Sequence, residues 1–269
     1  MLWLLGVSGL FVFIYVAIIG IAYVNQERMI FYPTALEPKH KFLLSLPYEE
    51  KFTETGHEIM HGLLVKAPNS KGLIVYYHGN GGDMSQWAGV AQEIALRVQW
   101  DVWMVDYPGY GKSTGQIESQ EQLLNSARKV FAQAKLEYPQ EKIAIFGRSI
   151  GSGIAVKLAA ENSVQGLILE TPYLSIARLT QGMYPWIPLF ALKYSLMSEE
   201  WIAKVQAPIL ILHGDQDDII PFEHGKKLAA LSSRSTFIQI PEGRHNNLSV
   251  YDLYWSSLEI FFRGLAGET

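Results

Sequence analysis

Residues Ile143–Gly151 read IAIFGRSIG, an apolar run that ends in a glycine, an arginine, a serine, an isoleucine and a second glycine. The run Ile143–Phe146 is typical of a strand buried on both faces, and a helical stretch follows directly. A G-x-S-x-G pentapeptide between strand and helix forms a nucleophile elbow, because its glycines let the backbone turn sharply and expose the serine hydroxyl. This placement predicts Ser149 as a nucleophile, and the alternative is a glycine-rich turn in which Ser149 only caps the helix.

Similar apolar runs recur on both sides of this elbow and alternate with helical stretches. The expected strands are His57–Val65, Gly72–Tyr77, Val102–Val105, Ile143–Phe146, Leu167–Leu169 and Ile209–Leu212. The expected helices are Met84–Val98, Ser119–Glu137, Ile150–Glu161, Phe222–Leu231 and Leu248–Phe262. This alternation predicts an α/β fold with a mostly parallel central sheet, helices on both faces, and ligands at the carboxyl ends of the strands.

A serine hydroxyl needs a general base within hydrogen-bond reach. His245 lies in a suitable place, in the loop between the run Thr236–Ile240 and the last expected helix, although a polar loop residue that contacts this helix would look the same. An α/β hydrolase carries its acid between serine and histidine, directly after a strand. Residues 213–221 (HGDQDDIIP) meet this condition, and their spacing alone leaves three acids open: Asp215, Asp217 and Asp218.

Acyl transfer also needs donors for the oxyanion that develops on the substrate carbonyl. The loop His78–Asp83 (HGNGGD) follows the strand Gly72–Tyr77, and its glycines permit close approach of the backbone. We expect the backbone N–H groups of Asn80 and Ile150 to form the oxyanion hole. The alternative is a tight turn that uses the glycines for geometry alone.

The first segment, Leu2–Val24, contains no charged side chain. It is long enough to cross a hydrocarbon core of about 30 Å, which needs about 20 helical residues. A cleaved signal peptide is the alternative, with a possible small-x-small site at Gly20–Ala22, but the basic n-region is missing and the apolar run is too long. We therefore expect a transmembrane anchor over residues 1–24, a single pass, and a hydrolase domain over residues 25–269.

Two other segments bear on this organisation. Residues Asn25–Tyr48 contain three prolines and no clear periodicity, which indicates a connector packed on the domain edge. Residues Tyr173–Val205 are too apolar for a solvated loop, and we expect a small helical cap at about 173–206. Three basic residues follow the expected anchor and none precedes it; they are Arg28, Lys39 and Lys41. By the positive-inside rule, this distribution weakly favours a cytoplasmic catalytic domain.

Composition excludes several kinds of protein. Hydrophobic residues make up 49% of the chain, the net charge is −4, and no basic cluster suited to nucleic acid is present. Cysteine is absent, which excludes disulfides, thiolate nucleophiles and cysteine-ligated zinc. The motif H-E-x-x-H at 57–61 falls in a strand-like stretch that separates its histidines by about 13 Å, so we expect no metal there.

Residues Gly111–Ser113 resemble the end of a P-loop motif. The motif requires a glycine at position 106, and this chain has Asp106 there. We expect neither nucleotide hydrolysis nor a cofactor.

Together these motifs resemble the α/β-hydrolase superfamily, and more narrowly the membrane-anchored Bem-type proteins and the α/β-hydrolase domain-containing group. The segments that carry the resemblance are Phe31–Pro33, His78–Asp83, Asp106–Gly111, Gly147–Gly151, Ala207–Gly214 and His245–Asn246. The family pattern HG-x-x-D-x-x-[VI]-P implies that the acid is Asp217. Some relatives remove palmitoyl groups from proteins, and members are described variously as esterases, thioesterases and peptidases.

The sequence therefore predicts a serine hydrolase that cleaves carboxylic ester or thioester bonds through an acyl-enzyme, on small-molecule, lipid-like or acylated substrates. The expected triad is Ser149, His245 and Asp217. A serine peptidase is the alternative within hydrolases. A non-catalytic binding protein, tethered to the membrane on a hydrolase scaffold, is the alternative from another class. The expected partners are the membrane, through residues 1–24, and the small-molecule or acylated substrate.

Overall fold

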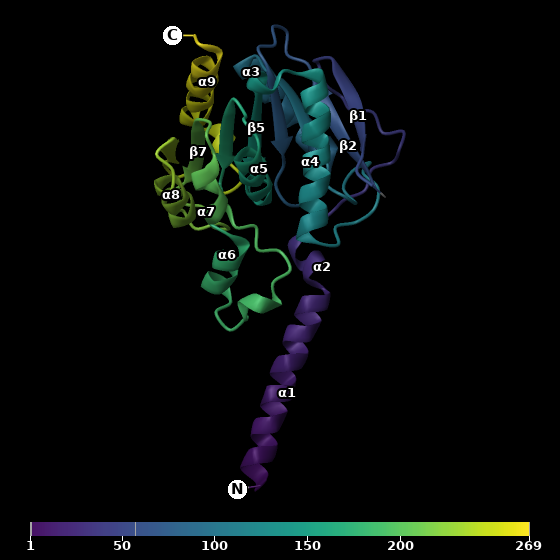
Figure 1. Cartoon of the computed structure of the whole chain (residues 1–269), viewed down its shortest axis with the longest axis vertical. Helices are drawn as coiled ribbons and strands as arrows, with labels where there is room; N and C mark the ends of the chain where they lie inside the picture. Colours follow the sequence, from purple (N-terminus) through teal and green to yellow (C-terminus); the bar gives the residue numbers. More distant parts are fainter. Residues whose placement is uncertain (1, 57, 269) are drawn as a thin grey trace.

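The computed structural model describes residues 2–56 and 58–268, and the side chains of residues 7–56 and 58–268. A central sheet lies between two layers of helices, and helix α1 (Leu2–Val24) projects away from this domain (Figure 1). The chain ends in α9 (Asp252–Ala266), at the end of the domain remote from α1.

The sheet has eight strands in the order β1-β2-β4-β3-β5-β6-β7-β8. Their bounds are β1 (Tyr48–Glu54), β2 (Ile59–Val65), β3 (Leu73–Tyr77), β4 (Asp101–Val105), β5 (Ile143–Arg148), β6 (Gly166–Glu170), β7 (Ile209–Gly214) and β8 (Ser235–Ile240). From β4 to β8 all neighbouring strands are parallel, whereas β2 is antiparallel to both β1 and β4. The mostly parallel α/β sheet predicted from the sequence is confirmed.

Side chains of the central strands alternate between two cores. In β3, Leu73, Val75 and Tyr77 pack with α4 and α5, whereas Ile74 and Tyr76 pack with α3 and α9. The helices of the domain are α2 (Gln26–Ile30), α3 (Met84–Val98), α4 (Gln120–Glu137), α5 (Ile150–Glu161), α6 (Ile176–Met183), α7 (Ser198–Trp201), α8 (Glu223–Ala230) and α9. Short 3-10 turns are η1 (Gln140–Lys142), η2 (Leu189–Ala191), η3 (Ile202–Lys204) and η4 (Leu248–Val250).

Some elements differ from the prediction. The sequence gives no signal for β1, because an edge strand pairs through its backbone while most of its side chains stay in contact with solvent; only Thr53 of its seven residues is buried. The last helix begins at Asp252 rather than Leu248, since η4 precedes it. The expected first strand begins at Ile59, and His57 lies outside the described residues.

The connector of residues 25–47 belongs to the domain rather than hanging free. Gln26 is buried, its amide group donates to the Ala191 carbonyl at 2.8 Å, and its side-chain oxygen accepts from the Lys193 amide at 2.7 Å. Further along, Pro33 bridges to Gly82 beside the carboxyl end of β3. The sequence missed α2, whose five residues are too few to show periodicity.

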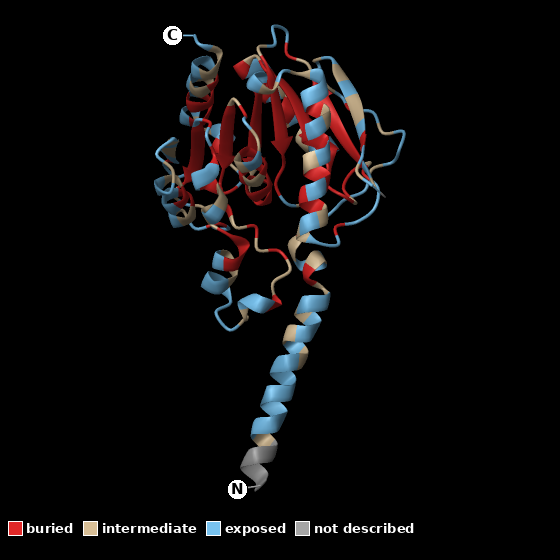
Figure 2. Cartoon of the chain, in the orientation of Figure 1, coloured by how far each residue is buried: buried red, intermediate tan, exposed pale blue. Residues whose placement is uncertain are grey.

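The segment between β6 and β7, residues 173–206, contains α6, η2, α7 and η3, and we call it the cap segment. Its two ends are anchored in the core by Tyr173, Tyr194 and Ile202, which are fully buried. Its middle is exposed and lies beside α1 (Figures 1 and 2).

Helix α1 is long and apolar enough to cross a membrane. Residues Val7–Val24 have a mean hydropathy of 2.4, and none of this stretch is buried within the structure. Figure 2 shows that the described part of α1 is largely exposed. A core helix of a soluble protein would be covered by the domain, and this one is not.

Candidate active site

Ser149 stands at a sharp turn between β5 and α5. Its backbone has φ 52° and ψ −119°, a conformation that a residue with a side chain rarely adopts. The flanking glycines are required by close packing: a Cβ atom on Gly147 would lie 2.5 Å from the Cβ of Ala155, and one on Gly151 would overlap the Tyr77 carbonyl oxygen. The strained turn therefore presents the Ser149 side chain above the carboxyl end of the sheet.

His245 reaches Ser149 from the loop after β8. Its Nε2 lies 2.9 Å from the Ser149 Oγ, and its Nδ1 lies 2.9 Å and 3.1 Å from the two carboxylate oxygens of Asp217. With the proton on Nδ1 donated to Asp217, Nε2 is free to accept from the serine hydroxyl. The structure thus brings together side chains that follow β5, β7 and β8, far apart in the sequence.

The Asp217 carboxylate is shielded from solvent and has four nitrogen neighbours. Its Oδ1 accepts from the backbone N–H groups of Ile219 at 2.9 Å and Ile220 at 2.8 Å, and its Oδ2 lies 3.2 Å from His213 Nε2. Burial by itself raises the pKa of Asp217, but the hydrogen bonds with His213 and His245 outweigh burial and hold the pKa below its usual value. Asp217 therefore stays ionised and can orient His245.

The other two acids of this loop do other things. Asp215 accepts from the backbone N–H of Glu242 at 2.8 Å and from the Gln239 side chain at 2.9 Å, so it ties the β7 loop to β8. Asp218 is exposed. Within the described part of the chain, the hydrogen bonds of His245 Nδ1 go to Asp217 and to neither of these acids.

The loop after β3 lies next to Ser149, since a Cβ atom on Gly79 would be 3.7 Å from the Ser149 Cβ. The Asn80 side chain turns away: its Oδ1 accepts from the Tyr110 hydroxyl at 3.1 Å and the Tyr32 amide at 3.2 Å, and its Nδ2 donates to the Ile30 carbonyl. Among the hydrogen bonds of the described residues, none uses the backbone N–H of Asn80.

The second expected oxyanion donor is Ile150, the first residue of α5. Its backbone N–H also takes part in none of the hydrogen bonds among the described residues. The first N–H groups of a helix have no partner within it, so this amide is available to a ligand.

Arg148 is a site residue that the sequence did not single out. It donates to the His245 carbonyl at 3.3 Å and to Asn246 Oδ1 at 3.0 Å, and its Nε lies 3.2 Å from Glu170. The other Glu170 oxygen accepts from the Tyr254 hydroxyl at 2.9 Å. Arg148 therefore links the elbow to the loop that carries His245. Its signal in the sequence is a charged residue at the end of a fully apolar strand.

A second buried polar cluster lies behind the β3 loop. The Asp106 carboxylate is 3.4 Å from His61 Nδ1 and 3.4 Å from His78 Nε2, and all three side chains are inaccessible to solvent. Glu50 lies 3.1 Å from His61 Nε2 and 2.6 Å from Lys112. His61 of the H-E-x-x-H motif thus contacts two carboxylates. In residues 2–56 and 58–268, no group of three His, Asp or Glu side chains is placed so that it could hold a metal ion.

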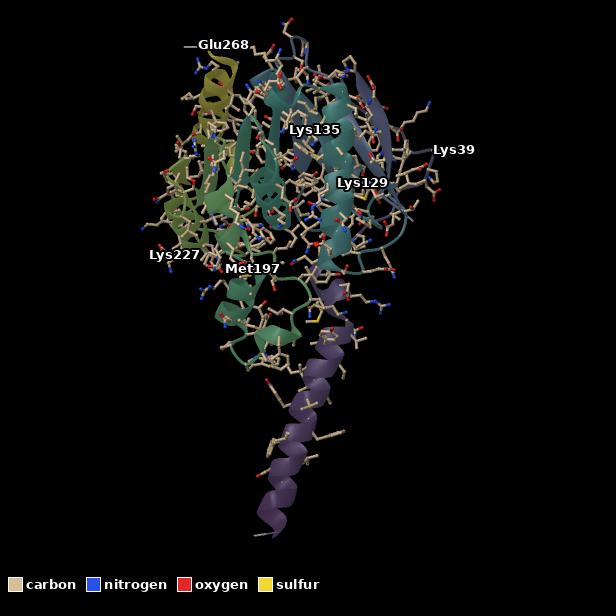
Figure 3. All side chains as sticks on the ribbon, in the orientation of Figure 1. Lys39, Lys129, Lys135, Met197, Lys227 and Glu268 are labelled. Atoms are coloured by element: carbon tan, nitrogen blue, oxygen red, sulfur yellow. The ribbon has the colours of Figure 1, made fainter. Side chains whose placement is uncertain are left out.

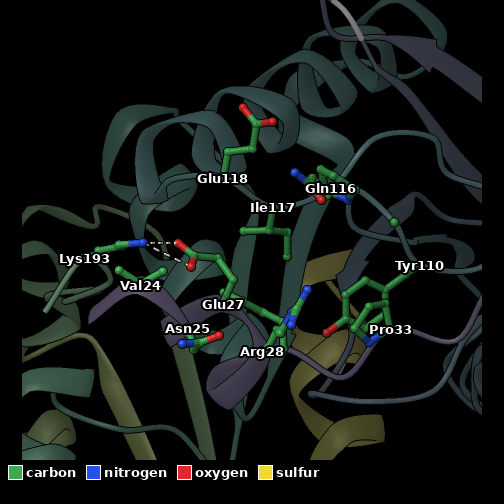
Figure 4. A pocket seen from close by; sticks show the side chains of 13 residues that line it. Val24, Asn25, Glu27, Arg28, Pro33, Tyr110, Gln116, Ile117, Glu118 and Lys193 are labelled. Carbon is green, nitrogen blue, oxygen red and sulfur yellow. Dashed lines mark hydrogen bonds and ion pairs between the residues drawn. The ribbon is translucent and has the colours of Figure 1, made fainter. Parts of the chain in front are cut away.

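A cavity of about 640 Å³ lies where α1 meets the domain (Figure 4). Its wall includes Val24 and Arg28, the ion pair of Glu27 with Lys193 at 3.1 Å, and Tyr110. The residues that line it do not include Ser149, Asp217 or His245. Tyr110 connects this cavity to the β3 loop, because its hydroxyl donates to Asn80 Oδ1 at 3.1 Å.

Proteins of known sequence or structure are similar to this chain. It is 29% identical over 197 residues to alpha/beta hydrolase domain-containing protein aho-3 of Caenorhabditis elegans, which covers 72% of this chain but only 58% of that protein. It is 28% identical to protein bem46 of Schizosaccharomyces pombe over 73% of this chain and 69% of that one. It is 29% identical to human alpha/beta hydrolase domain-containing protein 17B, over 78% of this chain and 72% of that protein. The resemblance seen in the motifs is confirmed.

Among solved structures, the esterase Est1E from Butyrivibrio proteoclasticus with bound ferulic acid matches with a TM-score of 0.65 and 20% identity, over 81% of this chain and all of that one. The Pyrococcus furiosus esterase Pf2001 matches with a TM-score of 0.69 and 15% identity, over 88% of this chain and all of that one. At these identities the two structures establish the fold. Residues 68–203 match the family described as serine aminopeptidase, S33. The chain therefore belongs to this family of α/β hydrolases.

Proposed function

We propose that the protein is a serine hydrolase that cleaves carboxylic ester or thioester bonds, with Ser149 as nucleophile, His245 as general base and Asp217 as the orienting acid. One observation carries this proposal: an unbroken hydrogen-bonded chain runs from Ser149 Oγ through the His245 ring to Asp217, with a 2.9 Å contact on each side of the ring. The strained backbone of Ser149 supports it, because such strain is retained where function needs it.

Acylation begins when Ser149 Oγ attacks the carbonyl carbon and its proton passes to His245 Nε2. Asp217 stabilises the imidazolium that forms. The negative charge that develops on the carbonyl oxygen is bound by the N–H groups of Asn80 and Ile150, and a donor of this kind contributes about 3–4 kcal/mol. The tetrahedral intermediate collapses, the C–O or C–S bond breaks, and the leaving alcohol or thiol takes the proton from Nε2.

Deacylation repeats these steps with water. His245 takes a proton from the water as its oxygen attacks the acyl-enzyme, and it then returns that proton to the Ser149 oxygen as the ester bond breaks. The products are a carboxylic acid, an alcohol or thiol, and the original enzyme.

The proposed substrates are fatty-acyl esters or thioesters taken from the membrane. We propose that residues 1–24 are a transmembrane anchor and that residues 25–269 are the hydrolase domain, into which the cap segment is inserted. The apolar anchor and the exposed apolar middle of the cap segment support it. Peptide hydrolysis is a second candidate, which the description of the family favours.

The first test is labelling of the full-length, detergent-solubilised protein with a fluorophosphonate, which reacts with activated serines. We expect labelling of the wild type, none in Ser149→Ala, and strong reductions in Asp217→Asn and His245→Ala. Ser163→Ala, a change at an exposed serine just beyond α5, is the control and should label normally. A folded wild type that does not label would overturn the proposal in favour of a binding protein.

A series of p-nitrophenyl esters then tests the acyl group. We expect octanoate to be cleaved with a higher kcat/KM than acetate. Preference for acetate would contradict a fatty-acyl substrate, and faster cleavage of aminoacyl amides than of any ester would favour a peptidase.

A further inference from the structure

The middle of the cap segment exposes a group of large apolar side chains. Residues 183–190, which we call the cap tip, include Met183, Tyr184, Trp186, Leu189 and Phe190, each between 43% and 87% exposed. No charged residue occurs between Arg178 and Lys193. Surfaces in contact with water rarely carry such a patch unless it meets a partner or a membrane.

The cap tip lies along α1. The Tyr15 hydroxyl donates to the Trp186 carbonyl at 2.9 Å, and Lys193 lies 4.8 Å from the ring centre of Tyr23 while pairing with Glu27. Figure 1 shows the same arrangement, with the loop after α6 descending beside the upper part of α1. Lys193 therefore marks the level where α1 ends, and Trp186 lies well below that level.

The depth follows from helix geometry. Tyr15 precedes Val24, the last residue of α1, by nine residues, which corresponds to about 13 Å at a rise of about 1.5 Å per residue. If α1 spans a hydrocarbon core of about 30 Å, a segment bonded to Tyr15 lies inside that core. The contact also explains a tyrosine deep in the helix, because its hydroxyl has a partner there.

We propose that the cap tip is inserted in the lipid bilayer beside α1, so that the domain contacts the membrane through two elements. The inference rests on the proposed anchoring by α1 and is independent of the triad. Backbone at this depth needs internal hydrogen bonds, and several are present: Tyr184 donates to Thr180, Ile187 to Tyr184, and Ala191 to Pro188. Pro185 and Pro188 carry no N–H to satisfy.

Lipid is the occupant that these observations favour over a second protein. The patch is continuous with the apolar surface of α1, and the charges of Arg178 and Lys193 stand at its two ends. Because the tip itself has no charge, its insertion should not depend on anionic lipids or on salt.

This insertion would fix the orientation of the domain. The cap segment leaves the sheet at the carboxyl end of β6, and the connector bridges to Gly82 and Gly111 at the carboxyl ends of β3 and β4. Both membrane contacts therefore lie on the edge of the sheet that carries Ser149, and this edge faces the bilayer surface.

The absence of cysteine makes a direct test simple, because each introduced cysteine is unique. We would attach an environment-sensitive dye to Phe190→Cys in the full-length protein, reconstituted in phosphatidylcholine vesicles. Leu136→Cys is the matched control, since Leu136 and Phe190 are both 87% exposed. Its neighbour Lys135 is far from α1 (Figure 3). Val12→Cys on α1 reports whether the anchor is inserted.

We expect lipids with a nitroxide on the acyl chain to quench the dyes at 190 and 12 at least three-fold more than the dye at 136, and aqueous iodide to do the opposite. Iodide quenching at 190 equal to that at 136 would overturn the inference. So would protection at 190 that appears only at high protein-to-lipid ratio, which would assign the tip to a second copy. An unquenched dye at 12 would overturn the anchor and the tip together, while fluorophosphonate labelling reports separately on the triad.

Discussion

Asp217 and Asp106 are both shielded carboxylates placed between two histidines, yet their surroundings differ at one point. His245 uses its second nitrogen to reach the Ser149 hydroxyl at 2.9 Å. The second nitrogen of His61 instead faces Glu50 at 3.1 Å, and that of His78 faces the carbonyl of its neighbour Gly79 at 2.7 Å. The residue types alone do not make a nucleophilic site; a hydroxyl on a strained turn has to complete the chain.

The Asp106 cluster has a structural consequence of its own. It joins β2, through His61, to the start of the loop after β3, through His78. That loop carries Asn80, one of the two expected oxyanion donors. We therefore expect the same substitution to abolish catalysis in the Asp217 cluster and mainly to lower stability in the Asp106 cluster.

The largest effect is expected for Asp217→Asn. The asparagine preserves the shape but cannot stabilise the imidazolium or select the tautomer, so kcat for an octanoyl ester should fall by about 10⁴-fold. The melting temperature should fall as well, because Asp217 is also shielded and faces two histidines. Steady-state kinetics and thermal unfolding measure the two quantities. A loss of less than about tenfold would show that the acid is not part of the reaction.

Asp106→Asn should lower stability but largely preserve catalysis. Loss of a buried carboxylate that faces two histidines costs about 2–4 kcal/mol, which lowers the melting temperature of a domain of this size by roughly 5–15 °C. Fluorophosphonate labelling per folded molecule should stay within about tenfold of wild type. Asp218→Asn, at an exposed acid, is the control for both measurements. A loss of labelling as large as in Asp217→Asn would show that the two clusters act in the same reaction.

A smaller effect on catalysis is expected for Arg148→Lys. Lysine keeps the charge beside Glu170 but cannot bind that carboxylate and the His245 carbonyl together, so kcat should fall about tenfold with KM nearly unchanged. Arg128→Lys, which changes the surface pair with Glu161 at 2.8 Å, is the matched control and should leave kcat unchanged. Equal losses in the two variants would show that Arg148 has no positioning role.

The smallest effect concerns pH. Burial raises the pKa of Asp106, but its hydrogen bond with His61 and its contact with His78 outweigh burial and place the pKa below the ordinary value of 3.8. The stability that this carboxylate contributes is therefore complete above about pH 5 and is lost as the pH falls through the lowered pKa. The difference in melting temperature between wild type and Asp106→Asn should be constant from about pH 7 to 5 and narrow below 3.8. A difference in melting temperature that grows as the pH falls would contradict a lowered pKa of Asp106.

The sequence predicted the parallel sheet because each central strand is a continuous apolar run between helices of ordinary length. It did not predict β1, whose pairing depends on the backbone and leaves no apolar pattern. The residue order Ser149, Asp217, His245 is visible in the sequence, and the structure places these side chains in hydrogen-bonding contact. Spacing alone left Asp215, Asp217 and Asp218 open, and only the resemblance to the family pattern pointed to Asp217. In the structure it is the Asp217 carboxylate that lies in hydrogen-bond contact with His245.

The contacts of Arg148 could not have been predicted either. They join the loop after β5 to the loop after β8, and neither spacing nor composition encodes such a distance. The Asp106 cluster was equally hidden, because its members come from three strands and one of them, His61, belongs to a motif that looks like a metal site.

The hydrogen bonds of the connector mean that α1 cannot be removed at an arbitrary residue. Gln26 is held by the cap segment, and the Ile30 carbonyl and Tyr32 amide hold the Asn80 side chain. A water-soluble enzyme obtained by deleting α1 should therefore begin no later than Asn25. Cutting a few residues further on would leave the sheet intact but release the loop beside Ser149, so the boundary of the domain lies at the end of α1.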